Sequence, residues 1–322
     1  MEDIPPIKKQ HLQSNTPLPP VFIPNELISL ILCFLSVKTI MQFRPRLVTH
    51  IKYWFYVWNP ATRTISDKFG FLRDYRDSTF VFSVGCDYLT GTYKVVALHI
   101  GKNKEKEIEN KSLWRSKVKV FNSGDNCWRN IRSFPFVPIL GNDGVHFSGT
   151  INWLAIHSDY APIEVGGTFK TLIGPVEKCV IVSLDLLTET YTQFLLPTGF
   201  KELPYDKPSV RVLMDCLCFS HDFKGTEFVI WMMKEFGVQE SWTQLFRIEY
   251  VNLQIHTMNG DTLLPLYFSK NGDTLIFTTE ITNKVFIYNR RDKTVEITIF
   301  DNRIRWTSAI EYVESLVPTP WK

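Results

Sequence analysis

Residues 145–154 read VHFSGTINWL, two short apolar strands joined by a Ser-Gly turn. The flanking residues are rich in β-branched and aromatic types, and glycine allows a tight turn, so the stretch predicts a β-hairpin. The same pattern recurs around Gly91, from Leu217 to Trp231, and from Leu266 to Phe277. The four hairpins begin near residues 80, 145, 216 and 266, which indicates a repeated supersecondary unit.

A second unit alternates with the hairpins, and it consists of an apolar strand ending at Asn or Asp, a short turn, and another strand. It occurs as Val120-Phe121-Asn122 leading to Trp128, Val182-Ser183-Leu184-Asp185 leading to Tyr191, Ile287-Tyr288-Asn289 leading to Val295, and more weakly at Leu245-Phe246-Arg247-Ile248. One hairpin and one such unit supply the four strands of a β-propeller blade. A further copy, from Tyr53 to Ile65, has no hairpin before it. We therefore predict a mainly β, propeller-like domain of about four to five blades.

The N-terminal part of the chain has a different pattern. Residues 1–20 are polar and rich in proline, which predicts a disordered tail. Over residues 21–45, large apolar residues recur every four positions from Leu27, which predicts an α-helix with one apolar face. Ser36 can cap a second short helix, and Pro45 cannot continue it. We expect two short helices before the first strand.

Composition and charge narrow the class of protein. Of the 322 residues, 44% are hydrophobic and 21% are charged, as in soluble globular proteins. The net charge of +3 gives no field that favours nucleic acid or a membrane, and the apolar run from Leu27 to Leu35 is about half the ~20 residues that span a bilayer. The N-terminus lacks an apolar export signal, and the six cysteines contain no C-x-x-C pair. We expect an intracellular protein, in the cytoplasm or nucleus, with free thiols and no nucleic-acid or membrane partner.

Several motifs, in the same order along the chain, resemble plant F-box proteins of the F-box-associated (kelch-like) interaction class. They are IPNELISLILCFL at 23–35 followed by VKTIMQFR at 37–44, WNPATR at 58–63, DYLTGTYKVV at 87–96, FVIWMMKEFGVQESWTQLF at 228–246, and EYVESL at 311–316. The resemblance implies a short α-helical F-box remnant at 21–45, an F-box-associated propeller-like domain at 53–316, and a C-terminal tail at 317–322.

The resemblance implies a non-enzymatic substrate-recognition adaptor of an SCF-type (cullin–RING) E3 ubiquitin ligase, with no cofactor or metal. The F-box would dock on the Skp adaptor, and the propeller would bind a protein substrate. The predicted adaptor-binding face consists of Pro24, Leu27, Ile28, Ile31, Leu32, Leu35, Val37, Ile40 and Phe43. Two short helices cannot bury so many apolar groups by themselves, so the residues require a covering surface, either a partner or the chain's own propeller.

The sequence departs from the family pattern after Arg44. The family's F-box continues into a third helix and a first propeller hairpin, whereas here Pro45 follows, and Trp58 of the WNPATR motif arrives fourteen residues after Arg44. The alternative is therefore an orphan propeller, a protein-binding module that has lost its coupling to the ligase through truncation of the F-box.

Signals for an enzyme are weak. No P-loop, dinucleotide-binding, zinc-protease or nucleophile-elbow motif occurs. Ser220-His221-Asp222 has the residue types of a hydrolase triad, but neighbours in a strand point to opposite faces, so we interpret it as the flank of a hairpin turn. Cys216 and Cys218 would share a strand face without further metal ligands at suitable spacing, and we interpret them as core or edge thiols.

Two further features have plain structural interpretations. The stretch from Lys102 to Lys119 holds seven Lys or Arg and three Glu, and we interpret it as a solvated loop between blades rather than a nucleic-acid patch. Six tryptophans recur at strand positions and are interpreted as blade core: Trp58, Trp128, Trp153, Trp231, Trp242 and Trp306.

Overall fold

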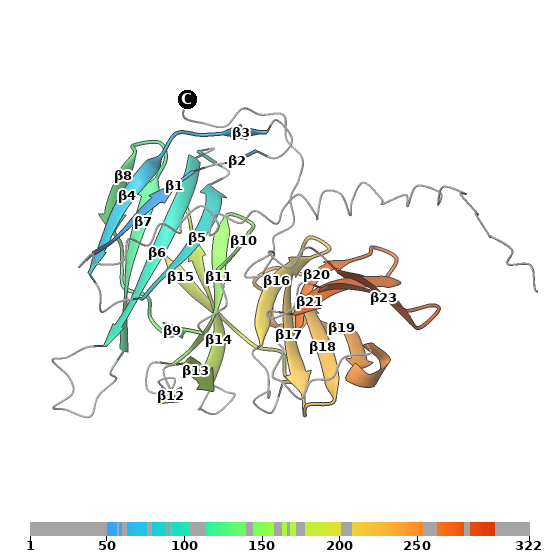
Figure 1. Ribbon diagram of the computed structural model, residues 1–322. Helices are drawn as coiled ribbons and strands as arrows, with labels where there is room; N and C mark the ends of the chain where they lie inside the picture. Colours follow the sequence, from blue (N-terminus) through green and yellow to red (C-terminus); the bar gives the residue numbers. More distant parts are fainter. Residues whose placement is uncertain are drawn as a thin grey trace, which may run out of the picture.

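The structure is a computed structural model of the chain (Figure 1). The residues that it describes are 50–56, 58–59, 63–75, 79–87, 89–90, 92–102, 114–139, 144–157, 163–165, 168–171, 178–200, 208–253, 263–279 and 284–299. These ranges contain β-strands and short 3-10 helices but no α-helix. No helix in them is long and apolar enough to cross a membrane.

Four antiparallel sheets of four main strands make up most of the described fold. Blade 1 contains β5 (Thr79–Asp87), β6 (Thr92–Lys102), β7 (Trp114–Asn122) and β8 (Cys127–Asn130). Blade 2 contains β10 (Val145–Phe147), β11 (Thr150–Ile156), β14 (Cys179–Asp185) and β15 (Tyr191–Leu195), with β9 (Val137–Pro138) paired to β11. Blade 3 contains β16 (Ser209–Leu213), β17 (Cys216–Phe223), β18 (Glu227–Met233) and β19 (Trp242–Glu249). Blade 4 contains β20 (Leu263–Phe268), β21 (Thr274–Thr279), β22 (Lys284–Asn289) and β23 (Thr294–Ile299).

Smaller elements complete the described chain. Three two-stranded pairs are formed by β1 (His50–Phe55) with β4 (Phe69–Tyr75), β2 (Trp58–Asn59) with β3 (Thr64–Ile65), and β12 (Ile163–Val165) with β13 (Thr168–Thr171). The 3-10 helices η4 (Gln239–Ser241) and η5 (Tyr250–Leu253) flank β19. The β1–β4 pair covers one face of blade 1 through a cluster of aromatic side chains.

The hydrophobic core lies between successive blades, and the middle strands of blade 2 are buried on both faces. All seven residues of β11 are buried. Trp153 belongs to a core cluster with Val96 and Val120 of blade 1, whereas the next residue, Leu154, belongs to a cluster with Phe219 of blade 3. This alternation is the period of two expected for a strand packed on both sides. Blades 3 and 4 share a third cluster.

The first strands of successive blades lie next to one another. β5 contacts β10, β10 contacts β16, and β16 contacts β20 (Figure 1). Blades that pack face to face, with their first strands side by side, form a β-propeller. The structure confirms the predicted mainly β, propeller-like fold, with four blades and the β1–β4 pair in the described part of the chain.

The Asn or Asp that ends the third strand of a blade shapes the turn to the fourth. Asp185 Oδ1 accepts hydrogen bonds from Leu187 N at 2.9 Å and from Thr188 N at 2.7 Å. Asn122 and Asn289 occupy the same place in blades 1 and 4, and each accepts from the N–H two residues on, at 2.9 and 3.0 Å. These side chains replace backbone partners in the turn, which is why the sequence repeats them. Four positions later the backbone has positive φ in all three turns, at Asn126, Glu189 and Lys293.

The structure corrects the interpretation of blade 3. The hairpin predicted from Leu217 to Trp231 is formed by the second and third strands, β17 and β18, and the first strand, β16, lies ahead of it. The weak unit predicted at Leu245–Ile248 lies within the single fourth strand, β19. A hairpin pattern does not say which strand lies nearest the axis, since packing against the neighbouring blades decides this.

The basic stretch from Lys102 to Lys119 also differs from its interpretation. β6 and β7 pair with each other from Lys102 and Trp114 inward, so the stretch joins two strands of blade 1 rather than two blades. The tails predicted at 1–20 and 317–322 and the helices predicted over 21–45 lie outside the described residues.

Candidate functional site

A hollow of about 570 Å³ lies between the β1–β4 pair and the turn from β7 to β8 of blade 1. Figure 1 shows β4 beside β8 at this edge of the molecule. Five of the residues that line the hollow are aromatic, and we call it the aromatic hollow. Its lining residues are Trp54, Lys68, Phe69, Gly70, Phe71, Phe121, Asn126 and Trp128.

The aromatic side chains of β1 alternate between its two faces, with Tyr53 and Phe55 toward blade 1 and Trp54 on the opposite face. The register with β4 shifts between Tyr53 and Phe55. Phe55 is buried in a cluster with Phe121 and holds the β1–β4 pair on blade 1. Trp54, between them, is 36% exposed, and its ring centre lies 5.4 Å from that of Phe71, which is 46% exposed. The Trp54–Phe71 pair is therefore a solvent-facing wall of the hollow.

Gly70 allows β4 to approach blade 1 closely. Its φ is +62°, a left-handed conformation that glycine adopts without strain. A Cβ at this position would lie 3.1 Å from Phe55 Cδ2 and 3.6 Å from the Phe121 ring. The backbone of β4 thus lies against the rings at the base of the hollow.

Hydrogen-bond donors surround these rings. Lys68 Nζ lies 5.7 Å from the centre of the Trp54 ring, and no carboxylate lies within ion-pair distance of it among the described residues. The indole Nε1 of Trp128 is buried and has no hydrogen-bond partner in the described part of the chain. No Asp or Glu lines the hollow. The nearby Asp125 carboxylate lies 3.7 Å from Arg129 Nη1.

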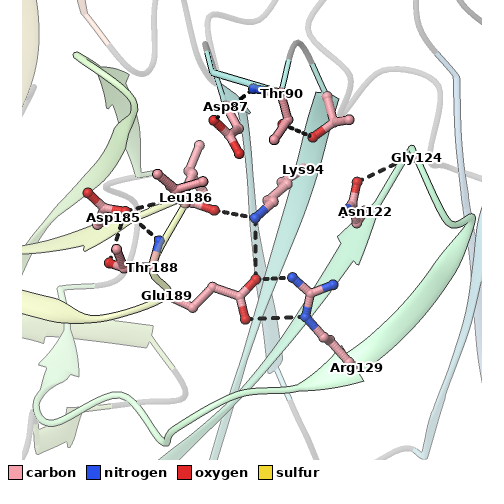
Figure 2. A network of polar contacts seen from close by, with 12 residues as sticks. Asp87, Thr90, Lys94, Asn122, Gly124, Arg129, Asp185, Leu186, Thr188 and Glu189 are labelled. Carbon is pink, nitrogen blue, oxygen red and sulfur yellow. Dashed lines mark hydrogen bonds and ion pairs between the residues drawn. The ribbon is translucent and has the colours of Figure 1, made fainter.

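A second polar cluster joins blade 1 to blade 2 (Figure 2). Lys94 of β6 is buried, donates to the Leu186 carbonyl, and lies with its Nζ 3.4 Å from Glu189 Oε1. Arg129 of β8 donates to both oxygens of the same carboxylate, with Nε 3.2 Å from Oε2. The hydrogen bond with Glu189 raises the pKa of Arg129 above its ordinary value. Both cations bind the one Glu189 carboxylate, so the cluster stabilises the interface between the blades.

The residues of the triad-like Ser220-His221-Asp222 do not form a catalytic relay. His221 Nδ1 lies 2.8 Å from the backbone oxygen of Asp222, and its Nε2 accepts a hydrogen bond from Trp231 Nε1 at 3.2 Å. Ser220 Oγ instead lies 2.8 Å from Ser209 Oγ. Burial lowers the pKa of His221 below its ordinary value. The imidazole is thus held by the backbone and an indole rather than by a serine.

Cys216 and Cys218, the pair singled out in the sequence, give no sign of a reactive or metal-binding site among the described residues. Cys218 is buried, Cys216 is half-buried, and both are free thiols. Burial raises the pKa of each above the usual thiol value, which disfavours the reactive thiolate. No group of three or more His, Cys, Asp or Glu in the described ranges is placed to hold a metal ion.

The predicted tryptophan core is confirmed only in part. Trp153 is fully buried, and Trp231 and Trp242 are half-buried against the core between blades 2 and 3. Trp128 packs on blade 1 but also lines the aromatic hollow. The Trp58 side chain and Trp306 lie outside what the structure describes.

The predicted adaptor-binding residues between Pro24 and Phe43 also lie outside the described residues. Sequence reasoning did not identify Trp54 and Phe71 as site residues. The only signal was the run of aromatics from Tyr53 to Tyr56, which breaks the alternation of a strand with one buried face.

Comparison with known proteins identifies the family of the propeller. Residues 47–319 match the family model described as the F-box associated beta propeller domain. Similar curated proteins include an F-box/kelch-repeat protein of Arabidopsis thaliana, 24% identical over 251 residues, which are 73% of this chain and 55% of that protein. Another is F-box protein CPR1 of Arabidopsis thaliana, 24% identical over 239 residues, which are 72% of this chain and 55% of that protein. The chain thus spans about half the length of these curated relatives.

Similar solved structures include the β-propeller domain of the Trilobed protease from Pyrococcus furiosus. It is 11% identical, with a TM-score of 0.36, and the match covers 79% of this chain and 68% of that one. YjhT is 12% identical, with a TM-score of 0.41, and the match covers 77% of each chain.

Proposed function

This chain belongs to the F-box associated beta propeller domain family, and on that premise we propose that it is the substrate-recognition adaptor of an SCF-type (cullin–RING) E3 ubiquitin ligase. The observation that carries the proposal is the family match over residues 47–319, supported by relatives that are themselves F-box proteins. In this role the chain catalyses no bond chemistry. It holds a substrate lysine close to a charged ubiquitin-conjugating enzyme and so raises its effective concentration.

The two ends of the proposed adaptor have separate tasks. The apolar residues between Pro24 and Phe43 dock on the Skp adaptor, because two short helices with one broad apolar face require a partner surface. The propeller binds the protein substrate. Blades 2 and 3 are packed on both faces, which makes them a rigid support for binding residues on turns and edges.

A second candidate is an orphan propeller that binds a protein without reaching the ligase. The observation that favours it is the start of β1 at His50. Only residues 45–49 separate Arg44 from this strand, and Pro45 is the first of them. Five residues are too few for the third helix with which the family's F-box normally continues.

A binding titration of the purified full-length chain against a Skp adaptor distinguishes the two candidates. The matched control is the double variant Leu27→Asp and Ile31→Asp, which places charge on the apolar face. Submicromolar binding that the control abolishes is the result expected of a ligase adaptor. A folded wild-type chain that does not bind would overturn that role and leave the orphan module.

A further inference from the structure

We propose that the aromatic hollow is the docking site for a short acidic segment of the protein substrate, in which one large apolar side chain is flanked by Asp or Glu. The inference rests on the proposed function, because it names the class of substrate that the propeller would hold. The proposed binding site lies where the β1–β4 pair meets the β7–β8 turn of blade 1.

The rings of the hollow provide a site for the apolar side chain. Single exposed apolar residues are common on protein surfaces, but Trp54 and Phe71 are exposed as a contacting pair beside a concavity. Its volume of about 570 Å³ is within the range of ligand pockets, roughly 300–1,000 Å³, and admits a Phe or Leu side chain. Tryptophan is also among the residue types that contribute most to protein interfaces.

The polar groups around the rings select an acidic partner. Lys68 presents an ammonium group to the hollow, with no carboxylate of the described chain paired to it. A buried indole N–H usually has an acceptor, whereas that of Trp128 has none among the described residues. A peptide carboxylate would pair with the Lys68 ammonium, and a rearrangement of the Trp128 ring on binding would bring its N–H to an acceptor. The side chain of Asn126, at the rim, can donate as well.

The same charges argue against a cationic occupant. An aromatic cage can bind an alkylated ammonium group, but here Lys68 already lies over the Trp54 ring, and a second cation would be repelled. No carboxylate lines the hollow to offset this repulsion. Charge complementarity therefore favours the acidic segment.

The test uses the ¹⁵N-labelled full-length chain and three capped pentapeptides. They are Gly-Glu-Phe-Glu-Gly, the charge-reversed Gly-Lys-Phe-Lys-Gly, and Gly-Glu-Ala-Glu-Gly, which lacks the ring. The indole N–H resonance of Trp128, assigned by its loss in Trp128→Phe, reports directly on the unpartnered donor. We expect the Glu-Phe-Glu peptide to shift this resonance saturably and the other two peptides to bind at least tenfold more weakly.

Two charge-reversal variants isolate the contribution of Lys68. Lys68→Glu should weaken binding of the Glu-Phe-Glu peptide about tenfold and strengthen binding of the Lys-Phe-Lys peptide. The matched control is Lys224→Glu, since Lys224 lies 5.4 Å from the centre of the Phe223 ring, outside the hollow. The control makes the same change in net charge and should leave both affinities unchanged. Trp54→Ala should weaken binding through loss of the ring.

Three outcomes would overturn the inference. These are no saturable shift of the Trp128 resonance by the Glu-Phe-Glu peptide, equal effects of Lys68→Glu and Lys224→Glu, or wild-type binding of the lysine peptide as tight as that of the glutamate peptide. Failure of this inference can be distinguished from failure of the proposed function. The peptide titration tests the aromatic hollow, whereas the adaptor titration tests residues 24–43. A chain that binds the peptide but not the Skp adaptor contradicts only the ligase role.

Discussion

Lys94 of blade 1 and Glu189 of blade 2 form an ion pair across the blade interface, with only 5% and 18% of their side chains exposed. Lys94 is the lysine of the family-like YKVV motif, and Glu189 follows the Asp185-capped turn at a residue with positive φ. The turn thus aims its carboxylate at the neighbouring blade. Figure 2 shows that Arg129 binds the same carboxylate, so that one acidic group joins two cations.

Glu189→Gln should lower the free energy of unfolding by about 2–3 kcal/mol. Loss of one partner leaves the buried Lys94 ammonium without a counter-charge, which costs more than the intact pair contributes. We expect the double variant Lys94→Met, Glu189→Met to be less destabilised than the sum of the single variants, since it removes both charges. Urea denaturation measures all of these changes.

Glu227→Gln is the matched control for this prediction. Glu227 also binds an arginine, Arg247, which is 41% exposed and lies within the same blade. Exposed pairs contribute about 0–1 kcal/mol, so this variant should stay close to wild type. Equal destabilisation by Glu189→Gln and Glu227→Gln would show that burial between the blades adds nothing to the Lys94–Glu189 pair.

Asp185→Ala should destabilise the chain by about 1–2 kcal/mol, because three donors lose their acceptor. These donors are the N–H groups of Leu187 and Thr188 and the Thr188 hydroxyl, which lies 3.0 Å from Asp185 Oδ1. Asp185→Asn retains the oxygen and should cost less. If the turn positions Glu189, a double-mutant cycle with Glu189→Gln will give a non-additive free energy of unfolding. Strict additivity would mean that the carboxylate finds its place independently of the turn.

The repeat could be predicted from the sequence because its signals are local. An Asn or Asp at the end of the third strand, as at Asn122, binds the turn that follows it, and a glycine such as Gly149 allows a tight hairpin. These positions lie within a few residues of the groups that they determine. Four hairpins of the fold were therefore found, although the pair in blade 3 was misplaced within its blade and the weak unit at Leu245–Ile248 is part of a single strand.

The aromatic hollow could not be predicted because it depends on contacts between distant residues. Trp54 faces solvent because Tyr53 and Phe55, on the other face of β1, pack on blade 1, and its contact with Phe71 exists only because β4 pairs with β1. In sequence, Tyr53, Trp54 and Phe55 are simply adjacent aromatics. Likewise, a lysine such as Lys94 is expected at the surface. It is buried here because the turn at residues 185–189 of blade 2 packs against it.

Stability should fall in mild acid, with His221 as one cause. Burial lowers the pKa of His221, and a proton on Nε2 would replace the acceptor of the Trp231 N–H with a donor. The unfolded chain therefore binds this proton more readily than the folded chain. The stabilisation is complete above the ordinary pKa of about 6.5 and is lost progressively as the pH falls below it.

Thermal melts at about pH 7.5 and about pH 5.5 should show the lower Tm at the acidic pH. His221→Gln should reduce the difference between the two melts, because glutamine does not titrate. A remainder is expected from His146, whose pKa burial also lowers. A variant with the full wild-type difference would show that His221 has no part in it.

Gly70→Ala should destabilise the chain and disturb the aromatic hollow, since two effects act at this position. The left-handed φ of +62° costs a residue with a Cβ about 1–2 kcal/mol, and the new methyl group would press on Phe55 from 3.1 Å.

Gly272→Ala separates the two effects: Gly272 has a φ of +75°, but its nearest contact, Phe268, lies 3.9 Å away. Both variants should lose stability in thermal melts, with the larger loss at Gly70. Only Gly70→Ala should shift the Trp128 indole N–H resonance, because only its methyl group displaces the rings on which Trp128 packs. Equal losses of stability and an unshifted resonance would mean that the base of the hollow accommodates a methyl group, and that close approach of β4 is not what shapes it.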